Sequence, residues 1–119
     1  MSFLKGINNS KKGDLPKLVR DKIPKIIRSS GNDYIATVEK DPTILTGWLA
    51  KKISEELDEY RAAPDDKKLE EAADMFAVCQ ALWGLSGLCI EDIMIKAAEK
   101  AKTRGEFNDG IILWDIITK

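Results

Sequence analysis

The chain has 119 residues, a formal net charge of −1 and no histidine, and 33% of its residues are charged. This length suits one domain with a core of its own, small enough to favour oligomerisation. The near-neutral charge argues against binding of a nucleic acid polymer, and the absence of histidine excludes the usual Ser-His-Asp and Cys-His mechanisms.

The N-terminal part of the chain predicts an irregular opening. Residues 1–14 lack a sustained apolar stretch, so we expect a flexible lead-in rather than a signal peptide. Asp21 is expected to cap a short helix that runs to about Ser30. Tyr34–Val38 alternates like a short strand, whose partner could be the apolar tail Gly110–Ile117.

Two long helices are predicted in the middle of the chain. Asp41 followed by Pro42 is a start signal for a helix that continues to about Ala63. Pro64–Asp66 turns the chain into a further helix that ends near Gly84–Gly87. Because this turn is short, the two helices should pack antiparallel.

A fourth helix, Ile90–Arg104, is predicted with Gly105 just past its end. Residues 15–119 are therefore expected to form one all-α domain, a four-helix bundle with short extended N- and C-terminal segments. No apolar run is long enough to span a membrane, and the few cysteines and the lack of a targeting segment favour the cytoplasm.

The third predicted helix also suggests how the chain assembles. From Ala72 to Leu85 it is apolar nearly all round, which predicts burial on every side. Four helices of this length cannot easily surround it, so a homodimer or homotetramer is expected. The alternative is a compact monomer with this helix at its centre.

Two pairs of acids, each three residues apart, fall on helix faces that are otherwise apolar: Glu56 with Glu59, and Glu71 with Asp74. At about 100° per residue, the first pair projects into the apolar stripe of its helix. That stripe consists of Leu45, Trp48, Leu49, Ile53, Leu57 and Tyr60. A charge removed from water is costly unless it is paired or binds a metal, so the pattern suggests a metal site.

The spacing also fits acids that are solvated or paired with lysine. Lys51 and Lys52 stand one turn before Glu55 and Glu56 and would neutralise them, while Asp58 points away as an ordinary surface acid. If a metal is bound, a ligand set of oxygens without histidine suits Mg²⁺, with Mn²⁺ as a substitute.

Two basic clusters would supply counter-charges for a polyphosphate. Arg20 and Lys22 flank Asp21, and Lys100 and Arg104 lie one turn apart near the end of the fourth predicted helix. The alternatives are a salt bridge within a loop and complementation of the helix dipole. Mg²⁺ held by carboxylates, together with Arg and Lys, is suited to cleavage of a phosphoanhydride.

Three motifs follow one another along the chain. Residues 17–24 read KLVRDKIP, residues 55–59 and 71–74 form EExxE…ExxD, and residues 104–107 read RGEF ahead of Ile-Ile-Leu at 111–113. Together they resemble the MazG-type all-α NTP pyrophosphatases, in their phosphoribosyl-ATP-pyrophosphatase-like branch. The family motif usually has Gly or another small residue where this chain has Glu106, which puts a negative charge beside the proposed phosphate-binding region.

The resemblance implies an oligomeric all-helical enzyme that cleaves the α–β anhydride of a nucleoside triphosphate to a monophosphate and pyrophosphate. It implies that Glu55 is a base, or an acid that orients the attacking water. The implied Mg²⁺ ligands are Glu56, Glu59, Glu71 and Asp74. The residues implied to screen phosphate charge are Arg20, Lys22, Lys100 and Arg104.

The substrate and the activity itself have alternatives. The superfamily acts on canonical, deoxy and damaged nucleoside triphosphates, which is a house-cleaning role, and also on phosphoribosyl-ATP. Trp48, Trp83 or Trp114 could stack on a base, or could simply belong to the core. A helical module that binds nucleotides without turnover, or a purely structural oligomer, would keep the same helices.

Overall fold

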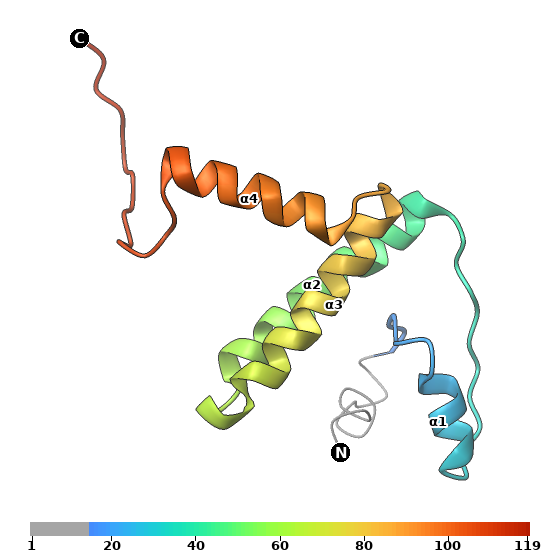
Figure 1. Ribbon diagram of the computed structural model, residues 1–119. Helices are drawn as coiled ribbons and strands as arrows, with labels where there is room; N and C mark the ends of the chain where they lie inside the picture. The colour runs from blue at the N-terminus through green and yellow to red at the C-terminus, as the bar shows by residue number, and fades with distance from the viewer. Residues whose placement is uncertain (1–14) are drawn as a thin grey trace. The chain divides into compact units, whose positions relative to one another are not determined.

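The computed structural model describes residues 15–119, which form α-helices joined by irregular segments and contain no strand. In chain order the elements are α1 (Ile23–Ser29), α2 (Pro42–Ala62), the 3₁₀ turn η3 (Asp65–Lys67), α3 (Lys68–Leu85) and α4 (Ile90–Arg104), as Figure 1 shows. The all-α prediction is thereby confirmed. The expected flexible lead-in, residues 1–14, lies outside the described residues.

The chain divides into two units, with the boundary between Ser86 and Gly87. The first unit contains α1, α2, η3 and α3, and the second contains α4 and the C-terminal tail.

The start of α2 follows the predicted signal. Asp41 is the N-cap, and its Oδ1 accepts hydrogen bonds from the backbone N–H groups of Thr43, at 2.9 Å, and Ile44, at 3.4 Å. Pro42 takes the first helical position, where no intrahelical N–H bond is lost. Because these interactions are local, the beginning of this helix could be predicted correctly from the sequence.

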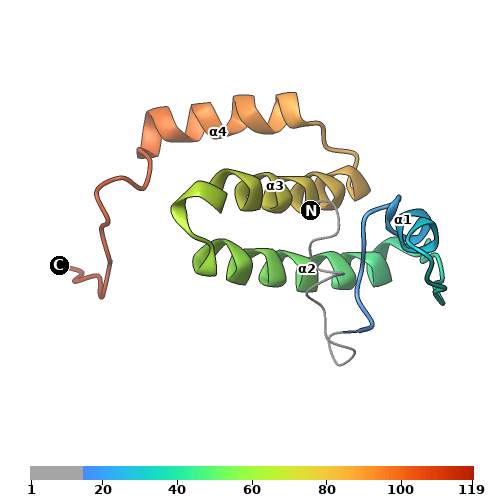
Figure 2. The ribbon, with the colours of Figure 1, turned by 90° about the horizontal axis from the view of Figure 1, so that it is seen from below.

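The connection between α2 and α3 is short and is stabilised by hydrogen bonds from one lysine. The Nζ of Lys68 donates hydrogen bonds to the carbonyl oxygens of Tyr60 and Arg61, and it lies 4.6 Å from the centre of the Tyr60 ring. A cation at this place satisfies carbonyls that the end of α2 leaves without partners. The two helices run antiparallel and side by side in Figures 1 and 2, as predicted.

Burial on α2 is confined to the side that faces α3. Leu49 is buried, whereas Leu57, which the sequence placed in the apolar stripe, is 44% exposed. Leu57 stands at the edge of that stripe on the helical wheel, and α3 covers only the middle of the stripe. The expectation of burial was therefore wrong for Leu57.

Within the first unit, α3 is covered on one side only. Leu69 is 84% exposed and Phe76 is 46% exposed, both on the face turned away from α2. The described residues of the first unit therefore do not surround α3, although the sequence predicted burial all round this helix. The apolar residues on its outer face remain open to solvent.

Two details of the N-terminal segment differ from prediction. The N-cap of α1 is Lys22 rather than Asp21, because the first α-helical hydrogen bond runs from Ile26 N–H to the Lys22 carbonyl. Residues 32–41 have no regular structure and are exposed, so the strand predicted at 34–38 was wrong. A strand needs a neighbour to complete its hydrogen bonds, and none lies beside this segment among the described residues.

The second unit consists of α4 and an exposed tail. Gly105 ends the helix as predicted, with φ at +80°, and its N–H donates to the Ala101 carbonyl at 2.8 Å. Residues 110–119 have no regular structure, so the tail forms no strand either.

Within residues 15–119, no single helix has the length and apolar composition needed to cross a membrane. The segments 65–85 and 90–104 reach the necessary length and apolar composition only when they are counted together.

Candidate metal centre

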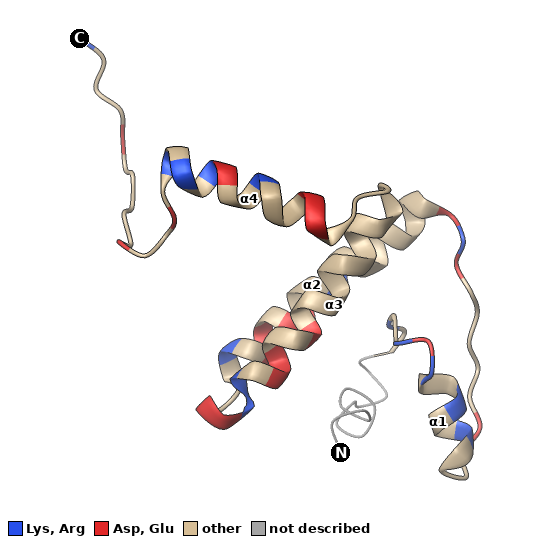
Figure 3. Ribbon diagram, in the orientation of Figure 1, with Lys and Arg blue, Asp and Glu red and all other residues tan. Residues whose placement is uncertain are grey.

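Three acids of the first unit converge between two helices. Glu56 and Glu59 project from α2 and Glu71 from α3, and one carboxylate oxygen from each lies within 4.8 Å of the other two. In Figure 3 the red acidic segments of the α2–α3 hairpin lie in the half that is nearer to the connection. These three residues form the acid cluster.

The acid cluster is largely withdrawn from solvent. Glu56 is 5% exposed and Glu71 is 8% exposed, and the Oε2 atom of Glu59 is also buried. Placing carboxylates this close together and out of water is unfavourable without compensating positive charge. The arrangement therefore calls for cations at this position, either from the chain or from solution.

The hairpin explains why these particular residues meet. Glu56 and Glu59 are separated by nearly one helical turn and so share a face of α2. The short connection through η3 brings the first turns of α3, with Glu71, back alongside that face. Since two packed helices hold the carboxylates, their backbone positions are fixed before any ligand arrives.

Asp74 has a different setting from the other predicted ligands. It lies one turn after Glu71 on α3, and its Oδ1 accepts a hydrogen bond from Nη2 of Arg20 at 2.8 Å. Arg20 comes from the N-terminal segment, 54 residues earlier in the chain. The structure thus brings together three of the four predicted metal ligands and places the fourth beside a predicted phosphate-binding residue.

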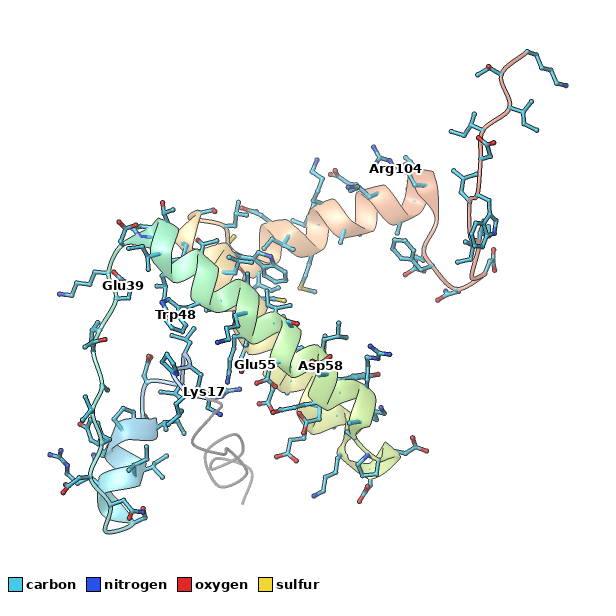
Figure 4. The ribbon with its side chains drawn as sticks, turned by 180° about the vertical axis from the view of Figure 1, so that it is seen from behind. Lys17, Glu39, Trp48, Glu55, Asp58 and Arg104 are labelled. Carbon is cyan, nitrogen blue, oxygen red and sulfur yellow. The ribbon has the colours of Figure 1, made fainter. Side chains whose placement is uncertain are left out.

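Lys52 belongs to the same region, although sequence reasoning gave it no functional role. Its Nζ lies 3.5 Å from Oε2 of Glu55 and 3.8 Å from Oε1 of Glu56. The pairing with Glu56 was predicted from the spacing, because a residue four positions before Glu56 lies on the same face of the helix. Glu55 itself is half-buried at the rim of the cluster, whereas Asp58 is exposed as predicted; Figure 4 shows both on α2.

The other predicted phosphate-binding residues lie elsewhere in the described part of the chain. Lys22 is exposed at the start of α1. Lys100 and Arg104 are exposed on α4, in the second unit, and Figure 4 shows Arg104 at the end of that helix. Glu106 is exposed just beyond it. The roles of Lys22, Lys100 and Arg104 remain predictions.

The three tryptophans have different surroundings. Trp48 is half-buried, with Nζ of Lys51 at 5.8 Å from its ring centre. Trp83 is half-buried in an edge-to-face contact with Phe76, with ring centres 6.4 Å apart. Trp114 is exposed in the C-terminal tail. Trp48 thus lies beside a lysine on α2, Trp83 packs against an aromatic ring on α3, and the stacking of a base on any of the three remains a prediction.

The acid cluster fits a hard divalent cation by its chemistry. It offers only carboxylate oxygens, without sulfur or imidazole nitrogen, and this is the donor type that Mg²⁺ and Mn²⁺ take in proteins. Burial fits as well, because a dication would offset the mutual repulsion of the three carboxylates.

Comparisons of the chain with protein-family models, with curated proteins and with solved structures gave no match.

Proposed function

We propose that this protein is a Mg²⁺-dependent nucleoside triphosphate pyrophosphohydrolase of the house-cleaning type, which cleaves the α–β phosphoanhydride. The observation that carries the proposal is the convergence of Glu56, Glu59 and Glu71 within 4.8 Å, out of solvent, on two packed helices. The basic side chains of Arg20 and Lys52 at the same place add the positive charge that a polyphosphate requires.

Each residue then has a role that its position supports. Glu56, Glu59 and Glu71 would hold Mg²⁺, and Asp74 would join them when Arg20 leaves it for a phosphate oxygen. When bound, Mg²⁺ supplies positive charge that polarises a phosphoryl group and favours attack by water. Glu55, at the rim, would orient that water and accept its proton as the bond to the bridging oxygen breaks and pyrophosphate departs.

The enzyme is proposed to act as a MazG-like homodimer or homotetramer. Residues 42–50 and 75–85 contain no charged side chain, and Figure 3 shows this half of the hairpin free of red and blue. With Phe76 exposed on α3 in this half, a second hairpin packed there would complete a four-helix bundle. Burial of this face would also give α3 the enclosure that its composition predicts.

One observation favours a second candidate function, a helical module without catalysis. Lys52 and Arg20 already neutralise part of the acidic charge, as ion pairs of a purely structural site would. Such a module predicts that Mg²⁺ leaves the melting temperature unchanged, since nothing would bind preferentially to the native state.

The proposal is tested by pyrophosphate release from canonical, deoxy and oxidised nucleoside triphosphates and from phosphoribosyl-ATP, with and without Mg²⁺. We expect Mg²⁺-dependent release that is lost in Glu56→Gln and Glu55→Gln and retained in Asp58→Asn, the matched change on the exposed side of α2. Cleavage of phosphoribosyl-ATP alone would assign the substrate to that alternative. No cleavage of any compound by the folded wild-type protein would refute the enzymatic proposal.

A further inference from the structure

We propose that Lys52 is a cation that moves between two partners: it holds the acid cluster when no metal is bound, and it binds the phosphate groups of the substrate once Mg²⁺ is present. This inference rests on the proposed function and assigns Lys52 as a positioning and phosphate-binding residue.

Lys52 is directed at the acids by its position on α2. At about 100° per residue it projects between Glu56 and Glu59 on the helical wheel. Its side chain is only 17% exposed, and its Nζ lies 3.8 Å from Oε1 of Glu56 and 3.5 Å from Oε2 of Glu55. An ammonium group withdrawn from water in this way is held there by negative charge.

The neighbouring lysine shows that this position is specific. Lys51 is exposed, and its Nζ lies 5.8 Å from the centre of the Trp48 ring, with no observed ion pair to Glu55 or Glu56 among the described residues. The two lysines share charge, length and helix, and differ only in the face that they occupy. Lys51 is therefore a matched control for Lys52.

Lys52 and a metal ion would compete for the same carboxylate. A dication coordinated by Glu56 would lie within a few ångströms of the ammonium group, and like charges at such a distance repel strongly where water is partly excluded. The four-carbon stem of lysine allows Nζ to move several ångströms while the helix stays in place. Metal binding should therefore displace the ammonium group from Glu56 without unfolding α2.

The displaced ammonium group needs a new anionic partner, because it starts from a partly buried position. Phosphate oxygens of a metal-bound polyphosphate would lie at the rim of the acid cluster, beside Glu55, within reach of the lysine stem. Arg20 stands in the same relation to Asp74, at 2.8 Å, on the α3 side of the cluster. The two cations thus approach the acids from two different segments of the chain.

The experiment measures two dissociation constants by calorimetry on the full chain: that of Mg²⁺ alone, and that of imidodiphosphate in saturating Mg²⁺. Imidodiphosphate carries the phosphate groups without a base, so the result does not depend on knowing the nucleotide. For Lys52→Met we expect Mg²⁺ to bind on the order of tenfold more tightly and imidodiphosphate on the order of tenfold more weakly. Lys51→Met should match the wild type in both titrations.

The opposite signs identify the proposed role, because a purely structural role of Lys52 would weaken both equilibria together. Lys52→Arg keeps the charge and should return both constants towards wild type, and equal helical circular dichroism shows that the variants are folded. Constants for Lys52→Met that equal those of the wild type, or that weaken together, would overturn this inference alone. Failure of the wild type to bind Mg²⁺ would overturn the proposed function and this inference with it.

Discussion

Replacement of Glu71 by Gln should abolish the response of the protein to Mg²⁺ while preserving its fold. Gln keeps the size of the side chain and one oxygen but removes the charge. Glu71 is the only member of the acid cluster contributed by α3, so the change removes the link between the two helices that a bound metal would make.

The expected size of the effect follows from the geometry. The ligand oxygens lie within 4.8 Å of one another, and two unit charges at that limiting distance repel by about 3.5 kcal/mol at an effective dielectric constant of about 20. Glu71→Gln removes two of the three repulsions in the cluster together with the favourable interactions of the Glu71 charge, so the effect of Mg²⁺ on each protein is measured against its own stability in EDTA. At a Mg²⁺ concentration of about 100 times its dissociation constant, the wild type should gain about 2.7 kcal/mol.

The variant should lose most of that gain. Removing a residue that only orients a metal ligand costs about 10–100-fold in affinity, and losing a direct ligand should cost at least about 100-fold. At the same Mg²⁺ concentration the remaining stabilisation is then about 0.4 kcal/mol. In melting temperature, the wild type should rise by roughly 11 °C and the variant by only about 2 °C.

The assay is thermal unfolding followed by circular dichroism, in EDTA and in a series of Mg²⁺ concentrations. Glu70→Gln is the matched control, because Glu70 precedes Glu71 on α3 but lies outside the acid cluster. Equal Mg²⁺ shifts in the wild type and Glu71→Gln would refute the reasoning, as would a Mg²⁺ shift lost equally in Glu70→Gln.

Three further changes test the fold and the proposed assembly. Asp41→Ala removes the oxygen that caps α2 and should lower the free energy of unfolding by about 1 kcal/mol, measured by urea titration; an unchanged midpoint would contradict the role of the cap. Gly105→Ala forces a side chain into a backbone conformation with φ of +80° and should weaken the end of α4 by about 1–3 kcal/mol, seen as faster amide hydrogen exchange there. Phe76→Glu places a charge on the outer face of α3 and should raise the dissociation constant of the assembly by at least about tenfold, measured by sedimentation. Ile35→Glu, the same kind of change in an irregular segment, should leave that constant unchanged. Equal effects of the two substitutions would argue against this interface.

The helices could be predicted because their signals are local. The cap and proline that open α2 act within a few residues, and the helical period put Glu56 on a face that proves to be buried. The strand at 34–38 failed for the opposite reason, since alternation describes one strand but not the neighbour that must pair with it. Burial of Leu57 failed because the wheel gives the direction of a side chain and not the width of the helix that covers it.

The surroundings of the acids were harder to foresee than the acids themselves. The pairing of Arg20 with Asp74 joins residues 54 positions apart, and no local spacing carries that information. Lys51 and Lys52 each precede an acid by four residues, and the helical wheel distinguishes them only by direction, because Lys52 alone projects between Glu56 and Glu59. How far each is withdrawn from solvent depends on the packing of α3 against α2, which leaves Lys52 half-buried and Lys51 exposed. Charge complementarity around a site thus depends on the tertiary fold, even when the site residues follow a simple motif.

The hairpin separates its charged residues from its apolar ones along its length. The acid cluster lies towards the connection, and residues 42–50 and 75–85, at the other end, carry no charge at all. On the proposed assembly, this separation allows the two ends to evolve independently. A gene duplicate could change the acids and basic residues that select its substrate and still assemble with its parent, so mixed oligomers with two different activities would be structurally accessible from a single duplication.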